Sequence, residues 1–74
     1  MHIDNLIDMA NRIGQFFQAM PDAAEATQGI AEHLRKFWTP TMRRELLAHL
    51  EATQAPTLLP IVREALTQHR LLLG

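Results

Sequence analysis

The sequence predicts an all-α fold, a small bundle of about four short helices. Two observations support this. Apolar residues recur at spacings of three and four, and each apolar stretch is bounded by a capping residue or a proline. The alternation of apolar and polar residues that is typical of strands is missing. The chain has 74 residues, so we expect a single domain that spans residues 1–74.

The first helix is expected from about Asp4, as the N-cap, to Met20, with Pro21 ending it. Its apolar arc covers about half of the circumference, which is broader than the ~100° that a simple surface helix needs. Two interpretations therefore stay open: a helix central to its own core, or one that also contacts a second protein. The apolar stripe is made of Ile3, Leu6, Ala10, Ile13, Phe17 and Met20.

The second helix is expected to begin after Asp22 and to run to about Trp38. Asp22, followed three residues later by Glu25, forms a capping-box pattern at the positive end of the helix dipole. Its apolar face is expected to hold Ala23, Ala26, Ile30, Leu34 and Phe37.

The third helix is expected from about Pro40 to Ala52. The residue before a proline avoids the helical region, and proline suits the first position of a helix, so Thr39-Pro40 both ends one helix and begins the next. Arg43 is unusual because it lies inside the apolar arc of this helix.

The fourth helix is expected from about Leu58 or Pro60 to Leu72, after a loop at residues 53–57. His69 lies in the middle of its apolar face. We interpret this histidine as a core or interface residue that is hydrogen-bonded to a neighbour.

Composition excludes several classes of protein. The chain has no cysteine, which excludes disulfides and iron–sulfur ligation. Its net charge of −1 gives no general attraction to nucleic acid or to an anionic membrane. The longest apolar run is Leu71-Leu72-Leu73, so we expect no membrane-spanning segment. A cytoplasmic location is the default expectation.

Catalytic and metal-binding patterns are also missing. The chain has no serine or cysteine nucleophile and no glycine-rich phosphate loop, so we expect no catalytic residues, no cofactor and no enzyme activity of the chain alone. His2, His33, His49 and His69 form no pair one helical turn apart, and Glu45 with His49 offers only two ligands, so we expect no metal site. His33 is expected to be half-buried.

The most distinctive segment runs from His33 to Arg44 and contains the only tryptophan, Trp38. Its basic residues suggest nucleic-acid binding as one alternative, but eight acidic residues offset seven basic ones in the chain, and DNA-binding domains usually carry a basic stripe. Tryptophan and arginine are also enriched at the centres of protein interfaces. The segment therefore favours a protein–protein contact, and we expect no nucleic acid as a partner.

Three parts of the sequence resemble a known family. They are MANRIGQFF at residues 9–17, Pro21-Asp22, and GIAEHLRKFWTPTMR at residues 29–43. They are similar to the delta subunit of soluble NAD-dependent formate dehydrogenases. The resemblance extends from about Asn5 to Leu50 and more weakly through residues 60–66. Leu59 stands where the family resemblance implies a capping serine before Pro60.

The resemblance implies a role. Such enzymes oxidise formate at a molybdenum or tungsten pterin centre and pass electrons through iron–sulfur clusters and flavin to NAD, with these sites in larger subunits. The delta subunit looks like a non-catalytic accessory component that assists assembly or stability of the complex. We expect the larger formate dehydrogenase subunits as partners, and the isolated chain to be capable of self-association. The alternative is a free-standing helical interaction or regulatory module. The predicted partner contacts are Phe16, Arg35, Lys36, Trp38, Pro40 and Arg43.

Overall fold

The structure, a computed structural model, describes residues 2–74, so Met1 of the predicted domain lies outside the described part. Among the described residues, helices account for 78% and no strand occurs. The all-α prediction is confirmed. The five helices are α1 (Ile3–Phe17), α2 (Ala23–Phe37), α3 (Pro40–Thr53), α4 (Pro60–Gln68) and α5 (Arg70–Leu73).

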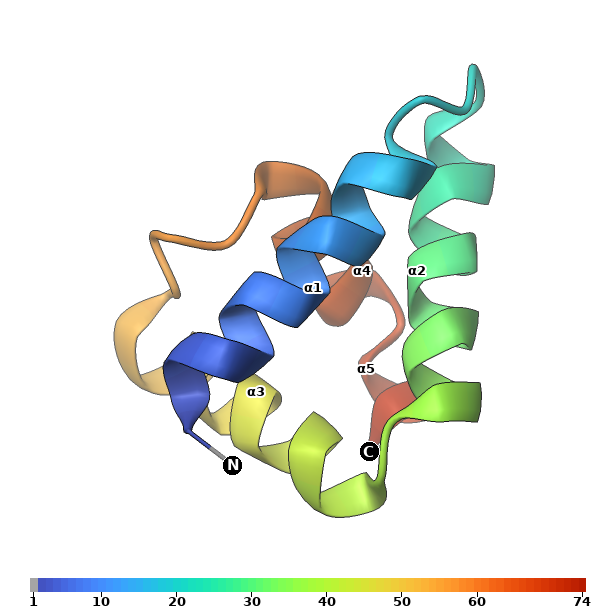
Figure 1. Cartoon of the computed structure of the whole chain (residues 1–74). Helices are drawn as coiled ribbons and strands as arrows, with labels where there is room; N and C mark the ends of the chain where they lie inside the picture. The colour runs from blue at the N-terminus through green and yellow to red at the C-terminus, as the bar shows by residue number, and fades with distance from the viewer. Residues whose placement is uncertain (1) are drawn as a thin grey trace.

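Helix α2 is the centre of the bundle because it contacts each of the other four helices. Figure 1 shows α1 and α2 joined by a loop, with α4 behind α1 and with the short α5 between the ends of α2 and α3. The bundle measures 31 × 22 × 18 Å along its principal axes. The bundle leaves one face of α1 and one face of α2 exposed to solvent.

The core is almost entirely aliphatic. Trp38, at the end of α2, is the aromatic residue that is buried, with 5% of its surface exposed. Each fully buried leucine or isoleucine contributes roughly 1.5–3 kcal/mol through removal of its surface from water. The largest fully buried hydrophobic side chains are Leu6, Ile30, Leu34, Leu46, Leu66, Leu73 and Val62.

Both ends of α1 differ from the prediction. The N-cap is His2, whose Nδ1 accepts a hydrogen bond from the backbone N–H of Asp4 at 3.1 Å. Asp4 itself lies inside the first turn, where its carboxylate still favours the positive end of the helix dipole. The helix ends at Phe17, because the backbone turns back there and the N–H of Met20 bonds to the Phe17 carbonyl at 3.0 Å. Pro21 therefore follows the end of the helix and does not cause it.

The caps of α2 and α3 confirm the predicted starts. Oδ1 of Asp22 accepts from the backbone N–H groups of Ala24 at 2.8 Å and Glu25 at 3.2 Å. Thr39 has extended backbone with ψ 156°, and its Oγ1 accepts from the N–H of Met42 at 3.2 Å. Each side chain satisfies amide groups that the first turn of a helix leaves without a partner.

The predicted fourth helix is divided into two. It begins at Pro60 but ends at Gln68, because His69 leaves the helical region with φ −112° and ψ 28°. The carbonyl of His69 then accepts from the N–H groups of Leu72 at 3.0 Å and Leu73 at 3.2 Å. This change of direction places Leu73 in the core, where 1% of its surface is exposed. His69 is intermediate in burial.

Glycine sets the approach of α1 to α4. A Cβ on Gly14 would lie 2.5 Å from Cγ2 of Val62, which is shorter than any normal carbon–carbon contact. The missing side chain thus lets the two helices pack closely. Gly14 is buried, as its place at the side of the apolar stripe of this helix indicates.

The connection between α3 and α4 is held by Asn11 of α1. Its Nδ2 donates to the carbonyl of Thr57 at 3.0 Å, and its Oδ1 accepts from the N–H of Leu59 at 2.9 Å. Leu59 is the N-cap of α4 and has no side-chain capping bond of its own. Asn11 therefore anchors the residue before Pro60 from another helix, by a bond to the Leu59 N–H and not to the first-turn amides that a capping serine would satisfy.

Candidate protein-docking surface

Aromatic rings from α1 and α2 meet in one continuous row on the surface. We call Phe16, Phe17, His33 and Phe37 the aromatic strip. The rings of Phe16 and Phe17 meet edge to face, with centroids 5.1 Å apart and an interplanar angle of 87°. Phe17 lies 6.4 Å from His33, and His33 lies 4.7 Å from Phe37. These spacings fall within the range in which aromatic pairs attract one another.

The strip follows from the positions of these residues in their helices. Phe16 and Phe17 occupy the last turn of α1, whereas His33 and Phe37 are one turn apart on α2 and so share a face. Gly29 makes room for the central ring, since a Cβ at that position would lie 2.5 Å from Cε1 of Phe17. The ring of Phe17 therefore rests on the backbone of α2.

The outer rings of the strip are open to solvent. Phe16 is 73% exposed and Phe37 is 71% exposed. A hollow of about 350 Å³ on one side of the strip is lined by Arg12, Ile13, Phe16, Phe17 and His33. A second hollow of about 190 Å³, which shares Phe17 and His33, is lined also by Gly29, Glu32, Lys36 and Phe37. Exposed apolar surface of this kind is typical of interaction sites.

Some of the charged side chains around the strip have partners within the chain and others do not. Nη2 of Arg12 pairs with Oδ2 of Asp8 at 3.0 Å. Oε1 of Glu32 accepts from Nε2 of Gln28 at 3.1 Å. Within residues 2–74, Lys36 forms no ion pair. Glu32 forms no ion pair in this part of the chain either, but Lys36 is the one of the two that also lacks a hydrogen bond.

Two of the predicted partner contacts lie inside the bundle. Trp38 is 5% exposed and Arg43 is 8% exposed. The Arg43 guanidinium donates from Nη1 to the carbonyl oxygens of Arg35 at 3.0 Å and Trp38 at 2.8 Å, and from Nε to that of Leu73 at 3.2 Å. These bonds account for an arginine in an apolar arc, and they occupy the group that a partner would need.

The other four predicted contacts are exposed: Phe16, Arg35, Lys36 and Pro40. Phe16 belongs to the aromatic strip and Lys36 borders it, whereas Pro40 begins the next helix. Their role as contacts stays a prediction. Phe37 was not among the predicted partner contacts, because the apolar periodicity placed it on the apolar face of its helix. The i, i+4 spacing of Phe37 to His33 was the available signal, and the expectation of a half-buried His33 is confirmed.

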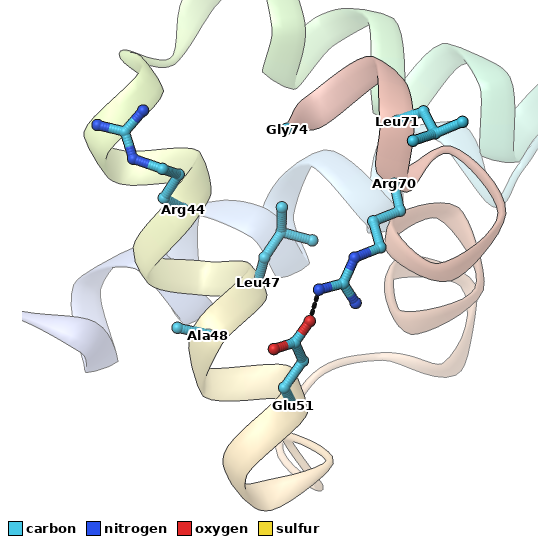
Figure 2. Close-up of a pocket in the computed structure, with 7 residues that line it drawn as sticks. All are labelled: Arg44, Leu47, Ala48, Glu51, Arg70, Leu71 and Gly74. Carbon is cyan, nitrogen blue, oxygen red and sulfur yellow. Dashed lines mark ion pairs between the residues drawn. The ribbon is translucent and has the colours of Figure 1, made fainter.

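A second groove lies between α3 and α5. It has a volume of about 490 Å³ and is lined by Arg44, Leu47, Ala48, Glu51, Arg70, Leu71 and Gly74. Figure 2 shows Arg70 reaching from α5 to form an ion pair with Glu51 of α3. Leu71 is 97% exposed. Arg70 and Glu51, on opposite sides of this groove, therefore neutralise each other within the chain.

No group of three or more metal-ligating side chains is found among residues 2–74. No described helix is both long enough and apolar enough to cross a bilayer.

The comparison with protein families assigns the chain. The family described as "NADH-dependant formate dehydrogenase delta subunit FdsD" matches residues 5–66. No curated protein matches the chain. No solved structure matches it either. The family match covers most of the 74 residues. It includes all of α2 and α3, and α1 from its third residue onward. The chain belongs to the family of formate dehydrogenase delta subunits.

Proposed function

We propose that this chain is a non-catalytic accessory subunit of a soluble NAD-dependent formate dehydrogenase. It assists the assembly or stability of a complex that contains molybdenum or tungsten, iron–sulfur clusters and flavin. It acts through protein–protein contacts with the larger subunits. The family match over residues 5–66 is the observation that carries the proposal.

The amino-acid composition and the exposed surface of the chain agree with an accessory role. The sequence has no cysteine, and iron–sulfur clusters are held mainly by cysteine thiolates. The ligands of the clusters therefore belong to other subunits. The exposed aromatic strip offers a surface on which another protein can dock, because large exposed rings lose unfavourable contact with water when they are covered.

The proposal includes partners and location. The partners are the larger formate dehydrogenase subunits, with no nucleic acid and no membrane among them. The location is the cytoplasm, where the NAD of such an enzyme is available. Each part rests on the family match and not on a separate measurement.

Affinity purification of the tagged chain from its native host tests the proposal. We expect the larger formate dehydrogenase subunits to co-elute in constant ratio through size exclusion. Deletion of the chain is expected to lower the amount of assembled, active enzyme without abolishing synthesis of the larger subunits. Recovery of the chain alone, or with unrelated partners, would instead favour a free-standing helical module.

A further inference from the structure

We infer that the aromatic strip is the centre of the surface by which this delta subunit binds a larger subunit of the enzyme. We further infer what it receives: an apolar side chain with a carboxylate beside it. The apolar group fills the hollow that is lined by Phe17, His33 and Phe37, and the carboxylate meets Lys36 at the edge of that hollow. This inference rests on the proposed function, since it takes the partner from it.

The distribution of phenylalanine is the first argument. The chain has three phenylalanines, and all of them, Phe16, Phe17 and Phe37, lie in the strip. The core is filled with aliphatic side chains and Trp38 instead. A sequence that needed these rings only for stability would place them in the core, where burial favours them most. Two of the three are more than 70% exposed.

The second argument is that the strip is organised before a partner arrives. Phe17 rests on Gly29 and touches rings on both sides, so its position is fixed within the bundle. His33 and Phe37 are aligned by one turn of α2. Rings that are already ordered lose little conformational entropy on binding, which is a property of residues that dominate interface energetics.

The two exposed rings supply only part of the area that a stable interface needs. Phe16 and Phe37, at 73% and 71% exposure, together offer on the order of 300 Å² if a whole ring side chain presents about 200 Å². A stable interface buries about 800 Å² on each partner. The strip suits the centre of a larger, mixed interface.

The charge at the edge of the strip selects the partner's chemistry. Lys36 lines the same hollow as Phe17, His33 and Phe37, and it has no ion-pair partner within residues 2–74. Glu32 lines that hollow too, but its carboxylate already accepts a bond from Gln28. On the other side, Arg12 is held by Asp8. Lys36 is the charged group of this hollow that has neither a hydrogen bond nor an ion pair among residues 2–74, so a carboxylate on the partner complements it.

The groove between α3 and α5 provides the matched control. It also carries an exposed apolar residue, Leu71, at 97% exposure. Its flanking charges, Arg70 and Glu51, pair with each other. Leu71 and Arg44 are therefore an exposed apolar residue and an exposed basic residue outside the strip, in a groove without a row of rings.

The test uses the tagged chain co-expressed with the larger subunits, with the ratio of co-eluted subunits and the dissociation constant as readouts. Phe16→Ser combined with Phe37→Ser is expected to weaken binding at least roughly tenfold, as loss of interface anchors does. Leu71→Ser is expected to bind like the parent chain. Circular dichroism and thermal unfolding of each variant establish that it is folded. Because both rings are exposed, the double variant is expected to unfold at the parent temperature.

The charge is tested separately. Lys36→Glu is expected to weaken binding several-fold and to reduce its sensitivity to salt, because one attractive pair becomes repulsive. Arg44→Glu, which reverses an exposed charge on the α3 groove, is expected to leave binding unchanged.

The outcomes separate the inference from the proposed function. If the parent chain binds no larger subunit, the proposed function fails. If the parent chain binds and the Phe16, Phe37 variant binds equally well, the inference alone is overturned. If Leu71→Ser loses binding and the double variant keeps it, the docking surface is the groove between α3 and α5, and the inference is overturned. A tight dimer of the isolated chain that the double variant abolishes would make a second copy the occupant, and the inference would be wrong.

Discussion

The guanidinium of Arg43 donates a hydrogen bond from Nη1 to the backbone carbonyl of Trp38 at 2.8 Å. The carbonyl groups in the last turn of a helix have no partner within the helix and carry the negative end of its dipole. Arg43, from α3, thus closes the C-terminal end of α2. The same side chain also reaches the carbonyl groups of Arg35 and Leu73 and so joins α2, α3 and α5.

Replacement of Arg43 by methionine is therefore expected to destabilise the bundle by roughly 2–4 kcal/mol, since hydrogen bonds to charged groups contribute about 1.5–3 kcal/mol each. A domain of this size has about 4–11 kcal/mol in total. Urea unfolding, followed by the fluorescence of the single tryptophan, measures the loss. Arg44→Met changes the same residue type at an exposed position and is expected to stay within about 0.5 kcal/mol of the parent. Equal stability of both variants would contradict the role of Arg43.

Asn11→Ala is expected to lower the free energy of unfolding by roughly 1–2 kcal/mol, because it leaves the N–H of Leu59 and the carbonyl of Thr57 without their partner. Hydrogen exchange at the Leu59 amide is expected to accelerate, whereas amides in the centre of α2 keep their protection unless global unfolding governs them. Gln15→Ala, at an exposed position of the same helix, serves as the control. Unchanged exchange at Leu59 in Asn11→Ala would show that the connection is held by other contacts.

Gly14→Ala is expected to destabilise the chain by roughly 1–3 kcal/mol, although alanine favours a helix by about 1 kcal/mol over glycine. The reason is the 2.5 Å approach of the added Cβ to Cγ2 of Val62. In a double-mutant cycle with Val62→Ala, the two changes are expected to offset each other in part, with a coupling of about 1 kcal/mol. Purely additive effects would mean that α1 and α4 separate freely and that the close approach is not required.

Thr39→Ala is expected to cost about 1 kcal/mol, because Oγ1 of Thr39 caps α3 through the N–H of Met42. Thr41→Ala removes a hydroxyl from an exposed position two residues later and is expected to have little effect. Thermal unfolding compares the two variants. A serine at position 39 is expected to restore the stability, which would separate the cap from other effects of the side chain.

The start of each helix shows what local sequence determines. Asp22 and Thr39-Pro40 mark helix starts that the structure confirms, because a cap bonds to amides only two or three residues away and needs no other part of the chain. The spacing of apolar residues likewise predicted the helical class. Where a local signal was weak, as at His2 and His69, the predicted boundary moved or a break was missed.

The use of individual side chains was decided by the tertiary structure. The role of Arg43 could not be predicted locally, because its partners at the end of α2 and at Leu73 are brought beside it only by folding. The role of Asn11 could not be predicted either, since it bonds to residues 57 and 59 far along the chain. In the same way, Phe37 belongs to an apolar face by periodicity, yet lies 71% exposed. Periodicity gives only the direction of a side chain around its own helix. Whether that direction meets a core or open solvent depends on where the other helices pack, and so the aromatic strip appears only in the folded chain.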